Sequence, residues 1–181
     1  MVQSIELLLD DEAESAVRAS WDALHGADLP SLATHTSATN RPHVTVAVTD
    51  DGDFTPGIES LRAVFAGWDL AGAGLAATVG APLLFGGHRH RWTVARQVVP
   101  SRPLLTLHAA VARALAQAAP DAEVHEQTRP DGWTAHVSLT RRTPADRLGD
   151  TLSVLDVEPI ACRLVGARLW DSVPKTVTPL A

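Results

Sequence analysis

The spacing of apolar and polar residues along the chain predicts a mixture of strands and helices in regular succession. Short apolar or alternating runs predict strands over 4–9, 43–49, 70–79, 82–85, 91–99, 124–127, 133–141 and 160–170. Apolar residues spaced three and four apart predict helices that begin near residues 11, 55, 101 and 143. We expect the tail, residues 171–181, to be irregular.

The predicted helices have recognisable start signals. Asp11 and Glu14 have the spacing of a capping box, and Thr55 and Thr143 are each followed by proline at the first helical position. Trp21 and His108 lie on the apolar faces of their helices. We therefore expect Trp21 to be a core residue and His108 to be a buried structural histidine.

Two of the predicted strands carry the same four-residue pattern. His43-Val44-Thr45-Val46 and His136-Val137-Ser138-Leu139 both read histidine, apolar, hydroxyl, apolar. Side chains on a strand alternate between its two faces. Each histidine therefore shares a face with its hydroxyl residue, while the apolar residues, Val48 included, point to the other face and into a core.

The order of predicted elements repeats around these two motifs. Residues 4–67 and 91–155 each read strand, helix, motif strand, helix, and the distances from the opening strand to the motif are similar. This order predicts one bilobal α+β domain over residues 1–181. We expect two mainly antiparallel sheets, flanked by helices and related by a pseudo-twofold axis, around a central cleft.

Composition narrows the class of protein. Hydrophobic residues make up 45% and charged residues 20%, which is typical of globular domains. The apolar runs are too short to span a bilayer, residues 1–6 lack a signal-peptide pattern, and Cys162 is the only cysteine. We therefore expect a cytoplasmic monomer without disulfides or a membrane partner.

Charge argues against a long nucleic acid as the partner. The net charge is −6, and the first 60 residues hold 11 acidic and 2 basic side chains. A protein that grips long nucleic acid usually has a basic surplus, so a small nucleotide or an RNA end is the better match. The most basic stretch, residues 88–91 (His-Arg-His-Arg), is either a phosphate-contacting loop or a solvated hairpin end.

Two imidazoles and two hydroxyls facing one cleft suit acid–base chemistry on a phosphate. One histidine can take a proton from the attacking oxygen while the other protonates the leaving oxygen. Thr45 and Ser138 can donate hydrogen bonds to the non-bridging oxygens. This chemistry needs no metal and no cofactor. The sequence leaves open which of His43 and His136 is the acid.

These motifs resemble those of the 2H phosphoesterase superfamily, in particular its 2′-5′ RNA ligase and cyclic phosphodiesterase branch. Pro42 precedes the first motif, Arg141 follows His136 by five residues, and Ser138 stands where threonine is commoner. The resemblance implies metal-independent action on 2′,3′-cyclic phosphates or 2′-5′ linkages. It also implies a substrate-binding role for Arg141, although strict alternation points Arg141 away from His136 unless the strand twists or ends first.

Two other functions remain open from the sequence. One is a nucleotide-binding or RNA-end-binding module without turnover. The other is a metal-dependent hydrolase that uses His43, His136 and either His88 or His90. Phe85 and Trp92 are candidates to stack on a base, or else core residues.

Overall fold

The structure is a computed structural model that describes residues 2–181. Its helices are α1 (Asp11–Gly26), α2 (Ile58–Ala66), α3 (Arg102–Ala118) and α4 (Leu148–Val154). Its strands are β1 (Gln3–Leu9), β2 (His43–Thr49), β3 (Leu75–Gly86), β4 (Arg91–Val98), β5 (His136–Ser138), β6 (Thr143–Pro144), β7 (Ile160–Asp171) and β8 (Thr176–Pro179).

The strands form one antiparallel sheet, and the predicted α+β class is confirmed. Their order is β1-β2-β5-β4-β3-β7-β8, with β6 paired to β4 and a further pairing of β1 with β7. A single continuous sheet replaces the two that were expected. The reason is that β3 pairs with both β4 and β7, and β7 pairs with both β3 and β1, so these two 12-residue strands join the others into one sheet.

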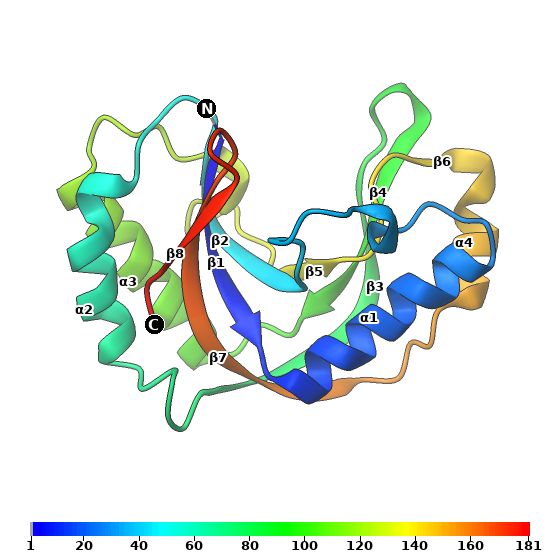
Figure 1. Ribbon diagram of the computed structural model, residues 1–181, viewed down its shortest axis with the longest axis horizontal. Helices are drawn as coiled ribbons and strands as arrows, with labels where there is room; N and C mark the ends of the chain where they lie inside the picture. The colour runs from blue at the N-terminus through cyan, green and yellow to red at the C-terminus, as the bar shows by residue number, and fades with distance from the viewer. Residues whose placement is uncertain (1) are drawn as a thin grey trace.

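The helices lie at the two ends of the molecule, on either side of the strands. Figure 1 shows α2 and α3 together on one side and α1 and α4 on the other. Helix α3 packs against α2 and β2, and α1 packs against α4. Each lobe therefore takes one helix from each sequence unit. The units 4–67 and 91–155 each contain a strand, a helix, a motif strand and a helix. That they form a structural repeat about a pseudo-twofold axis stays a prediction.

The start of the chain illustrates how the core forms. Ile5, Leu7 and Leu9 alternate along β1 and are fully buried. Asp10 then caps α1 by accepting a hydrogen bond from the Ala13 backbone N–H at 2.9 Å. The cap therefore lies one residue before the predicted Asp11. Along α1 the buried positions recur at helical spacing: Ala13, Val17, Trp21 and Leu24.

Several predicted boundaries were wrong. Residues 75–79 and 82–85 belong to one strand, β3, which has a register shift between Val79 and Pro82, and residues 70–74 precede it. The tail is not irregular, because β8 pairs with β7. The stretch predicted as strand 124–127 instead contains a short 3₁₀ turn, Glu126–Thr128. Thr55 does not cap a helix with its side chain, and Thr143 belongs to β6.

Within residues 2–181, no helix combines the length and apolar character needed to cross a membrane.

Candidate active site

The two motif strands lie side by side. β2 and β5 pair antiparallel, with Val44 directly opposite Val137, and both valines are fully buried. This register places His43 beside Ser138 and Thr45 beside His136 on the opposite face of the sheet. The two histidines are then diagonal neighbours, with Cα atoms roughly 7–8 Å apart, which leaves room for a phosphate between their rings.

A cleft of about 770 Å³ lies over this face, and all five residues predicted for the site line it. His43, Thr45, His136, Ser138 and Arg141 share its wall. A second cavity of about 490 Å³ adjoins it and shares His43, Thr45 and Arg141. The structure thus brings the predicted residues together across two strands that are separated by more than 80 residues of sequence.

Arg141 reaches the cleft because β5 ends early. The strand stops at Ser138, and the backbone N–H groups of Leu139 and Thr140 both donate to the Val94 carbonyl. Residue alternation therefore no longer applies at position 141, and the predicted strand to residue 141 was too long. Arg141 is exposed and lines both cavities.

Val48 lies on a different face from the one that alternation predicted. The pairing of β1 with β2 shifts register so that Ile5 faces Ala47 while Glu6 faces Thr45, which leaves Val46 as an extra residue in β2. Such a bulge reverses the alternation beyond it. Val48 accordingly lines the cleft instead of entering the core.

His43 is held by contacts to both ring nitrogens. Its Nδ1 lies 2.6 Å from the Arg41 carbonyl oxygen. A carbonyl only accepts, so Nδ1 carries a hydrogen and donates it. Its Nε2 lies 3.5 Å from Oε1 of Glu6. Arg41 is itself anchored, because its Nε donates to Glu14 of α1 at 2.5 Å.

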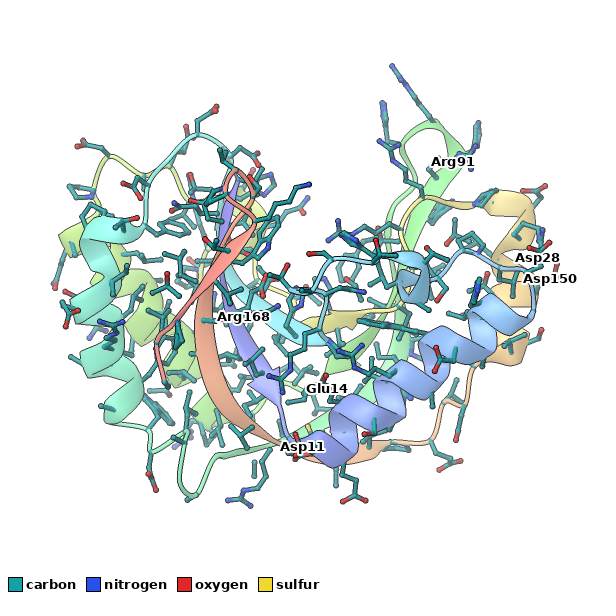
Figure 2. All side chains as sticks on the ribbon, in the orientation of Figure 1. Asp11, Glu14, Asp28, Arg91, Asp150 and Arg168 are labelled. Atoms are coloured by element: carbon teal, nitrogen blue, oxygen red, sulfur yellow. The ribbon has the colours of Figure 1, made fainter. Side chains whose placement is uncertain are left out.

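Glu6 belongs to a buried ion pair that sequence reasoning missed. Arg168 of β7 donates to Oε2 of Glu6 at 2.7 Å, and the Ser4 hydroxyl donates to Oε1 at 2.7 Å. Both charged side chains are less than a tenth exposed. Figure 2 labels Arg168 near the middle of the molecule, between the two sets of helices. Ser4 and Glu6 lie two residues apart, on the face of β1 opposite to the apolar Ile5 and Leu7, and this spacing was a signal that could have identified the polar face.

His136 has different surroundings. Its Nδ1 donates to the Thr134 carbonyl at 2.8 Å, and the Phe85 ring lies 4.4 Å from the imidazole, centre to centre. Burial lowers the pKa of His136, and the nearby His43 lowers it further, while the hydrogen bond to Thr134 opposes this shift. The neutral form of His136 is therefore favoured.

Two tryptophans hold the backbone of the motifs. The Trp133 indole N–H donates to the Thr45 carbonyl at 2.9 Å, and the Trp21 indole N–H donates to the Ser138 carbonyl at 3.0 Å. His108 stacks on Trp133 at 3.9 Å, and its Nε2 lies within 3.1 Å of the Val46 and Thr128 carbonyls. The predictions of a core Trp21 and a buried structural His108 are confirmed.

The basic stretch lies apart from the cleft. His88–His90 forms a short exposed turn at the tip of the β3–β4 hairpin, and Figure 2 labels Arg91 on this projecting hairpin. Phe85 lines the cleft, whereas Trp92 does not border it. In the described part of the chain, no group of three or more His, Cys, Asp or Glu side chains is placed to hold a metal ion. His88 and His90 are not among the residues that line the cleft with His43 and His136.

Comparisons with known proteins agree with this fold. The profile of the 2′-5′ RNA ligase superfamily matches residues 9–175. No protein with curated annotation matches the chain. Usb1 of Kluyveromyces marxianus is similar in structure, with a TM-score of 0.54 at 13% identity over 99% of this chain and 97% of that one.

Two further solved structures carry nucleotides. Usb1 of Kluyveromyces marxianus with uridine monophosphate has a TM-score of 0.54 at 12% identity, over 99% of this chain and 97% of that one. LigT of E. coli complexed with 3′-AMP has a TM-score of 0.53 at 15% identity, over 99% and 94%. At these identities the likeness establishes the fold, while the match over residues 9–175 establishes the family and supports an enzyme acting on phosphodiester bonds. The chain therefore belongs to the 2′-5′ RNA ligase superfamily, as its two motifs indicated.

Proposed function

We propose that this protein is a metal-independent phosphoesterase of RNA-type phosphates that uses His43 and His136 as an acid–base pair. It hydrolyses 2′,3′-cyclic phosphates, or makes and cleaves 2′-5′ linkages. The observation that carries the proposal is the convergence of two imidazoles, two hydroxyls and one guanidinium on a single cleft. That set matches the needs of phosphoryl transfer without a metal.

The geometry supports a direct displacement at phosphorus. One imidazole removes the proton from the attacking water as its oxygen bonds to phosphorus. The other imidazole gives its proton to the departing ribose oxygen as that bond breaks. With a nucleoside hydroxyl in place of water, the same transfers form a phosphodiester bond. Net proton count is unchanged, because one histidine gains the proton that the other loses.

The remaining side chains bind the phosphate. The hydroxyls of Thr45 and Ser138 lie beside the histidines and can donate to the two non-bridging oxygens, where charge increases in the transition state. Arg141 adds a positive charge at the wall shared by both cavities. We assign it to substrate binding, because an exposed guanidinium can attract a phosphate and hydrogen-bond to it.

A small nucleotide or an RNA end is the proposed substrate. A cleft of about 770 Å³ is in the range of small-ligand sites, and Phe85 and Trp133 on its wall offer aromatic surface to a base. The solved relatives bound to uridine monophosphate and 3′-AMP support this choice. We also propose that the protein is cytoplasmic and monomeric.

The test is a substrate panel in the presence of EDTA. It contains 2′,3′-cyclic mononucleotides, ADP-ribose 1″,2″-cyclic phosphate and 2′-5′-linked dinucleotides, with the position of the product phosphate read by phosphorus NMR. We expect turnover of at least one class, unaffected by EDTA. The double variant His43→Ala/His136→Ala, purified in parallel, controls for contaminating nucleases.

Two results contradict the proposal. Turnover that disappears with EDTA and returns with a divalent metal favours a metal-dependent hydrolase. Tight nucleotide binding without product across the panel favours the alternative, a nucleotide-binding or RNA-end-binding module.

A further inference from the structure

We propose that Glu6 is a positioning residue that keeps a proton on His43 in the free enzyme, so that His43 gives the first proton and His136 receives one. This inference rests on the proposed function and extends it, because it assigns unequal roles to two histidines of identical motif position. Two observations support it: the contacts of the His43 ring, and a row of side chains that crosses β7, β1 and β2.

Both nitrogens of His43 face hydrogen-bond acceptors. Nδ1 donates to the Arg41 carbonyl at 2.6 Å, and Nε2 lies 3.5 Å from Oε1 of Glu6. In the imidazolium form both N–H groups then point toward an oxygen. In the neutral form the lone pair of Nε2 faces a carboxylate, which is repulsive. The geometry therefore favours the protonated ring.

Glu6 is fixed in this place by the strands around it. Arg168 lies across from Glu6, and Glu6 lies across from Thr45, so a single row on the cleft face runs from the ion pair to the first motif. The Ser4 hydroxyl donates to Oε1, the same oxygen that faces His43. The Glu6 side chain is only 5% exposed, so solvent screens its charge little.

The same row continues to His136 without a carboxylate. Register places Thr45 beside His136, and β4 brings Gln97 to its other side. The Phe85 ring covers the imidazole. His136 thus has an amide and an aromatic ring where His43 has a charged carboxylate. Its Nδ1 hydrogen is committed to Thr134, so the lone pair on Nε2 is free to accept a proton.

Other charged groups face the same space. Arg168 and Arg141 are cationic, and His136 is the second titratable ring near His43. Further titratable or charged side chains line the two cavities: His35 and Lys175 the smaller one, and Asp50, His125 and Arg142 the larger one. Of these, Arg168 matters most, because it contacts Glu6 directly and competes with His43 for the same carboxylate.

The proton balance follows from these positions. The first displacement moves the Nε2 proton of His43 to the leaving oxygen, while the proton of the attacking water or hydroxyl goes to Nε2 of His136. His43 is then neutral beside Glu6, and His136 is charged beneath Phe85. Exchange of one proton with solvent at each ring restores the starting state, which Glu6 stabilises.

Two charge-neutralising substitutions make the test, because they break the same ion pair but act on His43 in opposite directions. Glu6→Gln removes the carboxylate, so the NMR titration midpoint of the His43 ring, followed at its Cε1 proton, is expected to fall. Arg168→Gln removes the competitor for Glu6, so the same midpoint is expected to rise. The His136 midpoint is expected to move less in both variants.

Activity gives the second readout. The basic limb of the pH profile of kcat/KM is expected to shift down in Glu6→Gln and up in Arg168→Gln. If either single variant unfolds because it leaves a buried charge unpaired, Glu6→Gln/Arg168→Gln removes both charges and is expected to lower the basic limb as Glu6→Gln does. Equal shifts in the same direction, or no shift, overturn the inference.

The NMR titration needs no substrate, so it separates two kinds of failure. Opposite midpoint shifts without turnover on any substrate support the role of Glu6 and contradict the proposed function. Turnover with unchanged midpoints supports the proposed function and overturns the role of Glu6.

Discussion

The two motif strands are alike in sequence and position but differ in their neighbours. β2 and β5 each place a histidine and a hydroxyl on the same cleft. β2, however, lies beside β1, which brings Glu6 to within 3.5 Å of His43, whereas β5 lies beside β4 and beneath Phe85. The motif thus determines which groups face the substrate, while the adjoining strands set the charge around each group.

What the two strands share is equally informative. The backbone carbonyl of each hydroxyl residue accepts a hydrogen bond from a tryptophan indole: Trp133 donates to Thr45, and Trp21 donates to Ser138. In each case the tryptophan belongs to one of the units 4–67 and 91–155, and the hydroxyl residue belongs to the other. The helices are exchanged between lobes in the same way. The two halves of the site therefore depend on each other for their geometry.

The largest expected effect comes from removing either ring. We expect His43→Ala and His136→Ala each to lower kcat/KM by about 10²–10⁴-fold, the range for general acid or base catalysis. Both side chains lie at the cleft surface, so circular dichroism and the thermal midpoint are expected to stay near the wild type. Full activity in either folded variant contradicts the pairing of the two histidines.

Removing a motif hydroxyl is expected to lower activity less than removing a histidine ring. Thr45→Val and Ser138→Ala each remove one hydrogen-bond donor to the phosphate, which lowers kcat by about 10²-fold with little change in KM. Ser138→Thr and Thr45→Ser keep the donor and serve as matched controls with near-wild-type rates. A loss in these controls equal to that in the donor-free variants indicates a packing role instead.

A smaller effect is expected at Arg141. Arg141→Ala removes a positive charge from the cleft wall, so KM rises about tenfold, a change of about 1.4 kcal/mol in binding, with kcat little changed. Arg89→Ala at the exposed hairpin tip is the matched control, because it removes the same charge outside the cleft. Equal changes in both variants point to a general charge effect and not to a contact.

The smallest expected effect is on stability, at His108. Burial lowers the pKa of His108, while hydrogen bonds to Thr128 and Val46 oppose the shift. The contribution of neutral His108 to the free energy of unfolding is therefore fully present above its unfolded pKa of about 6.5. It is lost as the pH falls through the folded pKa.

The substitution His108→Gln keeps an N–H donor but removes this titration. At pH 7 it is expected to cost about 1 kcal/mol of unfolding free energy. Between pH 7 and 5 it is expected to make the loss of stability shallower than in the wild type. Urea unfolding at pH 7 and pH 5 measures these free energies of unfolding. An equal loss of stability between the two pH values in the variant and the wild type contradicts the prediction.

Local patterns predicted the elements well but not how they meet. The boundaries of β2 and the apolar face of α1 follow from period and capping signals. β8 and the continuity of β3 do not, because they depend on hydrogen bonds to strands distant in sequence. Val48 shows the same limit within one strand, since a bulge opposite β1 turned it into the cleft.

The candidate site was predictable where two residues lie on one strand. His43 with Thr45, and His136 with Ser138, needed only alternation. Arg141 needed knowledge of where β5 ends, and the family resemblance supplied its position instead. Glu6 and Arg168 lie 162 residues apart, so their contact appears only once β1 pairs with β7, and the contact of Glu6 with His43 only once β1 pairs with β2.

The pH dependence of the two single-histidine variants tests the central claim most directly. The wild type is expected to give a bell-shaped profile of kcat/KM, with the acidic limb from His136, which must be neutral, and the basic limb from His43, which must be protonated. We predict that the residual activity of His136→Ala lacks the acidic limb and that of His43→Ala lacks the basic limb. Loss of the same limb in both variants, or the reverse assignment, contradicts the account.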